Sequence, residues 1–299
     1  MRSCHPLIGR IAWIVTVVAL ATALPSQAGP TTRADAAPRT VVILGASLSA
    51  GFICPFPGED GRVNRTVKLK QALAEFWDRE TARVSDCSDF ATFLDPVGKQ
   101  TVQVDRAKNQ DPDLLIGIDF LFWFGYGVVP AGKRLELLEK GLEMLTAFDC
   151  PIVVGDFPDM TGADPRMLRK AQIPSTEELR TLNERVRSWA AERANVRVFP
   201  LAKWVAELKS DGRTVVVEGE PVKLGPAALM QSDRLHPTKL GIAVVADGLR
   251  AELDAFLDEG SRLRVGDVSF DAIVESIRAD LELEEALAEP TAAEAAKSK

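Results

Sequence analysis

The fold is decided by the stretch Thr40–Ser47, which reads TVVILGAS. A continuous run of β-branched and apolar residues is typical of a strand that is buried on both faces, as in the centre of a parallel sheet. The run ends at Gly45 and is followed almost at once by Ser47. Ligands of open α/β sheets bind at the carboxyl ends of the strands. The stretch therefore predicts a parallel sheet with Ser47 at its functional edge.

Three further segments have the composition of buried strands: 113–118, 152–155 and 196–199. Apolar residues recur at helical spacing in five segments: 66–81, 99–109, 133–148, 175–194 and 238–257. Residues 86–98 look irregular, and 215–224 has the pattern of a small hairpin. Strands that alternate with helices in this way predict an α/β domain with a mainly parallel sheet.

Composition sets the broad class of the protein. The chain has 299 residues, 46% of them hydrophobic, which is the ordinary range for a globular protein. A net charge of −7 argues against a nucleic-acid binder, because such proteins need a basic face. One domain over 39–278 accounts for nearly the whole pattern. Residues 29–38 are expected to form a flexible leader, and 279–299 an acidic, Ala/Glu-rich tail without stable structure.

The N-terminus has the pattern of a secretion signal. Arg2 and Arg10 flank the start of an apolar run of 14 residues, Ile11–Leu24, and small residues precede a cleavage point after Ala28. A membrane span needs about 20 apolar residues. We therefore expect residues 1–28 to be removed, leaving a secreted or periplasmic protein without a stable membrane span. The alternative is an uncleaved anchor.

Cleavage after Ala28 would leave three cysteines, Cys54, Cys87 and Cys150, and a single histidine, His236. In an oxidising compartment three cysteines allow at most one disulfide. Cys54–Cys87 is the expected pair, because both are predicted on loops, although spacing does not fix the pairing. A zinc site is not expected, because the sequence has neither paired CxxC nor HxxxH spacing.

The residues that could carry chemistry lie at opposite ends of the domain. Ser47 follows the first strand, where it is either a nucleophile or simply the cap of a helix. The segment 233–238 (DRLHPT) places Asp233 three residues before His236. An activated serine needs an imidazole as base and a carboxylate to orient that imidazole. If histidine-assisted chemistry exists in the cleaved chain, His236 performs it.

Two segments resemble the motif blocks of a known family. GASLSAG at 45–51 and DRLHPT at 233–238 are similar to the first and last blocks of the GDSL/SGNH hydrolases, which include secreted esterases, thioesterases and lysophospholipases. The resemblance implies a flavodoxin-like three-layer α/β/α fold and no metal or organic cofactor. It also implies that Ser47 is the nucleophile, His236 the base and Asp233 the orienting carboxylate.

The chain departs from the family pattern at two places. Ala46 stands where the family has an Asp that holds the turn, and the third block lacks the family's Asn. That Asn donates to the oxyanion, and losing one such donor costs about 2.7–4 kcal/mol of transition-state stabilisation. The resemblance assigns oxyanion binding to the N–H groups of Ser47 and Gly98. The Trp123 indole N–H or an N–H at 125–127 could replace the missing donor.

Aromatic residues are concentrated directly after the middle strand, in 119–127. Phe120 and Phe122 are expected in the core. Trp123 and Tyr126 are expected to line a substrate pocket. Asp119 ends an apolar strand, where it could bind substrate with a shifted pKa or cap the following turn.

The sequence therefore predicts a secreted serine hydrolase that cleaves a carboxylic ester or thioester through an acyl-enzyme on Ser47. Its substrate would be a small-molecule, lipid or glycan ester. Two alternatives remain at this point. One is a weak or inactive relative that binds a glycan or lipid through 119–127, and the other is an acyltransferase that uses the same three residues.

Overall fold

The computed structural model describes residues 37–56 and 67–278. The expected signal peptide (1–28) and tail (279–299) lie outside the described residues, as does the expected leader apart from residues 37 and 38. None of the described helices is long and apolar enough to cross a membrane.

The core of the described chain is a parallel sheet of five strands in the order β2-β1-β3-β4-β5. The strands are β1 (Arg39–Ile43), β2 (Ala82–Asp86), β3 (Leu114–Gly117), β4 (Ile152–Gly155) and β5 (Val196–Phe199). This order is that of flavodoxin-like sheets. The central strands β1, β3 and β4 are apolar and buried, as the sequence pattern indicates. The predicted α/β fold class is confirmed.

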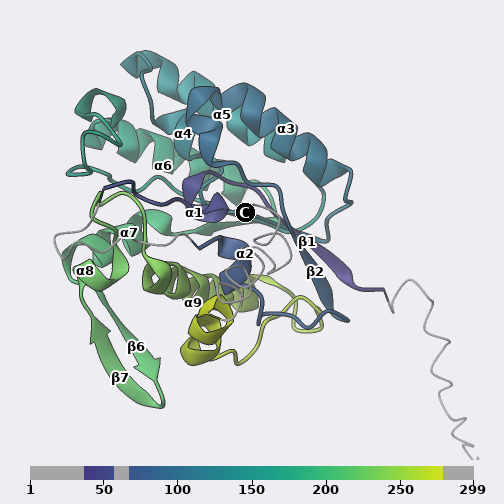
Figure 1. The fold of residues 1–299 in the computed structure, drawn as a ribbon. Helices are drawn as coiled ribbons and strands as arrows, with labels where there is room; N and C mark the ends of the chain where they lie inside the picture. The colour runs from purple at the N-terminus through teal and green to yellow at the C-terminus, as the bar shows by residue number, and fades with distance from the viewer. Residues whose placement is uncertain (1–36, 57–66, 279–299) are drawn as a thin grey trace, which may run out of the picture. The chain divides into compact units, whose positions relative to one another are not determined.

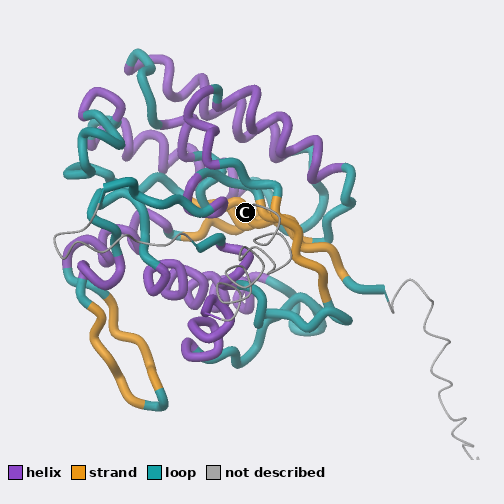
Figure 2. The backbone as a smooth tube through the Cα atoms, in the orientation of Figure 1, coloured by secondary structure: helices purple, strands orange, loops and turns teal. Residues whose placement is uncertain are grey.

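Helices cover both faces of the sheet, so the domain has three layers (Figure 1). On one face lie α3 (Pro96–Lys108), α5 (Arg134–Leu145) and α6 (Thr176–Ala191). On the other lie α2 (Leu69–Ala72) and α9 (Lys239–Phe256). The tube in Figure 2 shows the strands between these two sets of helices. The capping box expected at Ser175 and Glu178 is present at the start of α6.

The remaining elements are mostly short. Helical pieces are α1 (Ser47–Ala50), η2 (Phe90–Leu94), α4 (Phe122–Gly125), η3 (Ala131–Lys133), η4 (Lys170–Gln172), α7 (Leu201–Ser210) and α8 (Pro226–Leu229). Residues 270–278 are also helical. The predicted hairpin is β6 (Arg213–Val217) paired antiparallel with β7 (Glu220–Leu224), and it projects from the domain in Figure 1.

Three local expectations are corrected. The helix predicted over 66–81 is only the four residues of α2, and turns follow it. Its later apolar residues are buried by tertiary contacts instead: Trp77, for example, donates its indole N–H to the carbonyl of Leu263. The strand β2 was not predicted, because it lies at the sheet edge and its polar residues are only partly buried. The helix α7 was also not predicted.

The expected Cys54–Cys87 disulfide is wrong, because Cys54, Cys87 and Cys150 are all free. Cys87 directly follows β2, where its N–H is donated to the carbonyl of Ile43. Its thiol accepts a hydrogen bond from the Gln110 side chain at 3.2 Å. The thiol of Cys54 instead lies 3.5 Å from Oγ of Ser232.

We therefore expect the unfolded protein to titrate the same number of thiols with and without prior reduction. In the native state Cys54 and Cys87 should react slowly with a thiol reagent, because both are buried. Burial also raises the pKa of Cys87, and raises that of Cys150 to about 11, so little reactive thiolate is present. Thiol counting in denaturant tests this, and a lower count before reduction would contradict it.

Candidate active site

The turn that carries Ser47 is held by side chains from other elements. The side-chain amide of Gln103, in α3, pairs with both polar backbone groups of Gly45: Oε1 accepts the N–H at 2.8 Å, and Nε2 donates to the carbonyl at 3.0 Å. The Gly45 carbonyl also accepts the N–H of Asp89, from the segment after β2, at 3.1 Å. Gly45 is therefore held from two elements just before α1 begins at Ser47.

Asp119, two residues after the end of β3, contacts the same turn. One carboxylate oxygen accepts the N–H groups of Leu48 at 2.9 Å and Ser49 at 3.3 Å, and the other accepts the Ser49 hydroxyl at 2.6 Å. Burial raises the pKa of Asp119. The side chain is buried and turned towards α1, so the expectation that Asp119 binds substrate is corrected: its partners are backbone and side-chain groups of the chain itself.

Ser47, His236 and Asp233 meet at the carboxyl edge of the sheet. Nε2 of His236 lies 3.0 Å from Oγ of Ser47, and Nδ1 of His236 lies 2.7 Å from a carboxylate oxygen of Asp233. These distances are in hydrogen-bond range for a nucleophile, a base and an orienting group. With its proton on Nδ1, the imidazole donates to Asp233 and leaves Nε2 to accept the serine hydroxyl.

Asp233 is fully buried, and its second carboxylate oxygen accepts the N–H groups of Leu235 and His236, each at 3.0 Å. Burial alone would raise the pKa of Asp233. The hydrogen bonds and charge of His236, with the hydrogen bond from Leu235, outweigh burial and hold the pKa of Asp233 below its usual value. The residue is therefore an ionised carboxylate at neutral pH, which is the form that stabilises a protonated imidazole.

Two residues that the sequence did not single out hold the histidine loop in place. The buried amide of Gln231 accepts the N–H of Cys54 and donates to the carbonyls of Phe52 and Pro237, all at 2.9 Å. Gln231 thereby joins the segment after α1 to the loop that carries Asp233 and His236. The ring of Phe52 also stacks on the imidazole of His236, with centroids 4.3 Å apart. A lone Gln and a lone Phe carry no sequence signal for these contacts.

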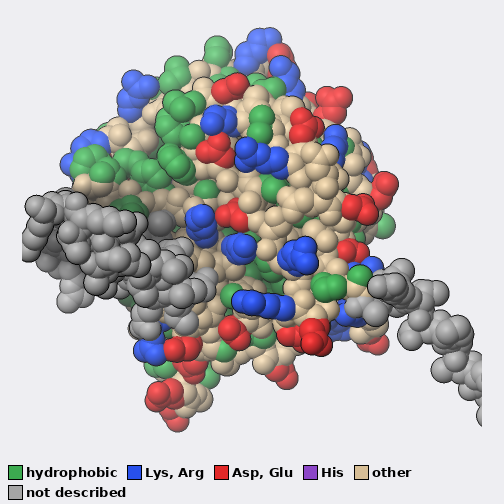
Figure 3. Space-filling view, turned by 45° about the vertical axis from the view of Figure 1, so that its right-hand side comes forward, with side chains coloured by type: hydrophobic (Ala, Val, Ile, Leu, Met, Phe, Trp, Pro, Cys, Tyr) green, Lys and Arg blue, Asp and Glu red, His purple; other side chains and the backbone are tan. Residues whose placement is uncertain are grey.

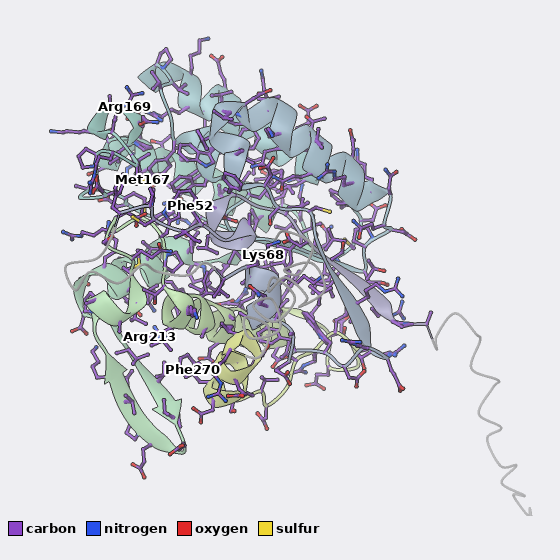
Figure 4. All side chains as sticks on the ribbon, viewed as in Figure 1. Phe52, Lys68, Met167, Arg169, Arg213 and Phe270 are labelled. Atoms are coloured by element: carbon purple, nitrogen blue, oxygen red, sulfur yellow. The ribbon has the colours of Figure 1, made fainter. Side chains whose placement is uncertain are left out.

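A small cleft opens over the serine and histidine. It is lined by Ser47, Leu48, Phe52, Val67, Gln231, His236, Pro237 and Ile242. Figure 4 shows Phe52 close to α1, with Met167 of the loop after β4 further along. That loop touches the segment of Phe52, because the guanidinium of Arg166 lies 3.6 Å from the ring centroid of Phe56. The cleft is therefore bounded by residues far apart in the sequence.

Exposed apolar side chains lie near the cleft. Phe90, at the start of η2, is 53% exposed, and its ring centroid is 6.4 Å from that of Phe52. Ile53 and Phe93 are 44% and 49% exposed. Charged side chains are spread over most of the face drawn in Figure 3, and hydrophobic side chains gather at its upper left.

The expected oxyanion role of Gly98 is corrected. Gly98 lies in the first turn of α3, and its N–H is donated to the carboxylate of Asp95 at 3.0 Å. Asp95 is the N-cap of that helix, and a Cβ at Gly98 would lie 2.2 Å from its oxygen. The glycine therefore serves a helix cap, which the sequence motif does not distinguish from an oxyanion turn.

The expected pocket residues Trp123 and Tyr126 belong to the core. Tyr126 is 1% exposed, stacks on Phe122 at 4.2 Å and donates its hydroxyl to the carbonyl of Pro158. Trp123 is 7% exposed, and within the described residues its indole N–H has no acceptor. The backbone N–H groups of Tyr126 and Gly127, which were expected as possible oxyanion donors, are instead donated to the carbonyls of Phe122 and Gln172. Phe120 is buried, as predicted.

The chain is similar in structure to several solved proteins. No family model and no curated protein matches the chain. A gut microbial diltiazem-metabolizing enzyme is similar over 72% of this chain at 13% identity, with a TM-score of 0.46, and the match covers 47% of that protein.

Two further structures are described as lipolytic proteins of the G-D-S-L family. The one from Veillonella parvula matches 70% of this chain and 95% of its own at 13% identity and a TM-score of 0.43. The one from Desulfitobacterium hafniense matches 70% and 97% at 15% identity and a TM-score of 0.41.

Proposed function

We propose that the protein is a serine hydrolase that cleaves a carboxylic ester or thioester through an acyl-enzyme on Ser47. The observation that supports it is the continuous chain of contacts from Asp233 through His236 to Ser47 Oγ, at 2.7 and 3.0 Å. We further infer export from the signal-like segment 1–28, so that the substrate would be met outside the cytoplasm.

In the first half-reaction Oγ of Ser47 attacks the carbonyl carbon while Nε2 of His236 takes the hydroxyl proton. The ionised Asp233 stabilises the imidazolium that forms. The tetrahedral intermediate then collapses: the bond to the alcohol or thiol breaks, and His236 returns the proton to that leaving group. In the second half-reaction His236 activates water, which releases the acid and restores the Ser47 hydroxyl.

The oxyanion of this intermediate needs hydrogen-bond donors, and the N–H of Gly98 is donated to Asp95 instead. The N–H of Ser47 is one, because it has no acceptor in the described part of the chain. We assign the second to the N–H of Phe90. Asp89 donates its own N–H to the carbonyl of Gly45 at 3.1 Å, which fixes the next amide beside the serine turn. Within the described residues this N–H also has no acceptor outside η2.

Replacing Phe90 with proline should lower kcat by about 10²–10³-fold, because it removes one oxyanion donor. Proline fits at this position: it is the first residue of η2, and the preceding Asp89 has the extended conformation that proline favours, with φ −141° and ψ 116°.

The matched control is Phe90→Ala, which removes the ring but keeps the N–H. We expect it to retain kcat within a few-fold, and steady-state kinetics of both variants measure the difference. An equal fall in kcat for the two variants would assign the effect to the ring and would contradict the assigned donor.

The alternative of a non-catalytic binder that uses 119–127 has less support, because its expected contact residues Asp119, Trp123 and Tyr126 are buried.

The test of the proposed function is turnover of activated carboxylic esters and thioesters of several acyl lengths. We expect acid to be released from at least one of them. Adding an alcohol acceptor distinguishes transfer, which yields a new ester, from hydrolysis. No turnover of any ester in the series would contradict the proposal.

A further inference from the structure

The short helix α1 has no means of fixing its own direction. It contains four residues, and the residue before it, Ala46, gives no side-chain cap. A single helical turn is unstable in isolation, because nucleation costs more than one hydrogen bond returns. The direction of the Ser47 hydroxyl and N–H must therefore be set by contacts from outside the helix.

The carboxylate of Asp119 makes those contacts. One oxygen accepts the N–H groups of Leu48 and Ser49, and the other accepts the Ser49 hydroxyl. The first N–H groups of a helix have no acceptor within the helix, and a side-chain oxygen that accepts them fixes where the helix begins. The N–H of Ser47, by contrast, has no acceptor among the described residues, and Ser47 lines the cleft.

The sequence at the turn is adapted to this carboxylate. A Cβ at position 45 would lie 2.1 Å from the Asp119 oxygen and 2.5 Å from Oγ of Ser49, so only glycine leaves room for it. Gln103 holds the same glycine from the α3 side. Asp119, Gly45 and Gln103 therefore form one clamp around the strand-to-helix turn.

We propose that Asp119 is the positioning residue of the nucleophile and sets the orientation of Ser47 from the end of β3. Ala46, within the turn itself, has no polar side-chain group that could do this. The inference rests on the proposed function. It separates Asp119 from the triad, because its carboxylate acts on the backbone of α1 and not on His236 or substrate.

The test compares Asp119→Ala with Asp156→Ala. Asp156 is a matched control: it directly follows the neighbouring strand β4, is 9% exposed, and accepts a helix N–H, that of Ala202, at 2.7 Å. Burial raises the pKa of both carboxyl groups. A merely structural buried Asp should therefore behave alike at the two positions.

We expect Asp119→Ala to lower kcat by about 10²-fold with KM little changed, because a misplaced reacting group costs rate rather than binding. The rate of Ser47 labelling by a fluorophosphonate should fall in parallel. Asp156→Ala should lower the melting temperature comparably and keep kcat within about twofold. Equal kcat values for Asp119→Ala and wild type would overturn the inference, as would equal losses in the two variants.

Asp119→Asn gives a second test should the alanine variant not fold. Its amide oxygen can still accept the two N–H groups, so kcat should stay within about tenfold of wild type. A folded Asp119→Asn as inactive as a chain without the nucleophile would mean that the charge acts in the chemistry, which overturns positioning. Turnover by wild type is measured first, so failure of the proposed function is distinguished from failure of this inference.

Discussion

Replacing Ser47 with alanine is expected to lower kcat for ester hydrolysis by about 10⁴–10⁶-fold, since removing the nucleophile of a serine hydrolase leaves only binding and oxyanion stabilisation. The hydroxyl is partly exposed at the start of α1, and its contact is with Nε2 of His236. Its loss should therefore leave the melting temperature nearly unchanged. Initial rates with the best ester, together with thermal unfolding, measure both effects.

The control for this variant is Ser232→Ala. Ser232 is next to Asp233 in the sequence, but its hydroxyl faces away from the triad, towards the Phe56 carbonyl and the Cys54 thiol. We expect kcat to remain within about twofold of wild type. A Ser47→Ala protein that kept more than a tenth of the wild-type kcat would exclude Ser47 as nucleophile.

Asp233→Asn should lower kcat by about 10⁴-fold, because an amide at this position can hold the imidazole in the wrong tautomer and does not stabilise its cation. The Asn oxygen can still accept the N–H groups of Leu235 and His236, so the loop should keep its shape. Asp164→Asn is the control, because the Asp164 N–H is donated to the carbonyl of Asp233 at 2.8 Å while its carboxylate pairs with Arg166 and not with His236. We expect the control to keep its activity, and similar losses in both variants would contradict the assignment.

The same variant has a predictable pH dependence of stability. In the folded protein the contacts of Asp233 with His236 and Leu235 hold its pKa below the ordinary value for an aspartate. Its contribution to stability is therefore fully present above that value and is lost as the pH falls through the folded-state pKa. The difference in melting temperature between wild type and Asp233→Asn should shrink below about pH 4. A difference that grew on acidification would contradict the direction of the shift.

The sequence predicts the central part of the fold because local patterns reflect burial there. The apolar runs at β1, β3 and β4 lie in the centre of the sheet, where most of their residues are buried, and such runs predict buried strands. In the edge strand β2 only Ala82 is buried, and Arg83, Ser85 and Asp86 are polar, so its pattern is weak. The helix predicted over 66–81 failed for a related reason, because its apolar residues are buried through turns and not along one helical face.

The site divides in the same way. Ser47, Asp233 and His236 were predicted from residue type, since acyl transfer needs these groups and the cleaved chain would have one histidine. Residues that act through backbone contacts were not found: Gln103 and Gln231 pair with peptide groups of distant segments.

The sequence predicts substrate binding for Asp119 and oxyanion binding for Gly98, and the structure gives both residues other contacts. The carboxylate of Asp119 is bound by N–H groups of α1, and the N–H of Gly98 is bound by Asp95. Which way an N–H points depends on backbone conformation, and no single residue type encodes it.

The most direct test is covalent labelling of the wild-type protein with a fluorophosphonate at neutral pH, followed by mass mapping of the adduct. The geometry predicts about one adduct per chain, on Ser47, with labelling abolished by Ser47→Ala and strongly slowed by His236→Ala. An unlabelled wild-type protein that turns over no ester, or an adduct on another residue, would contradict the account.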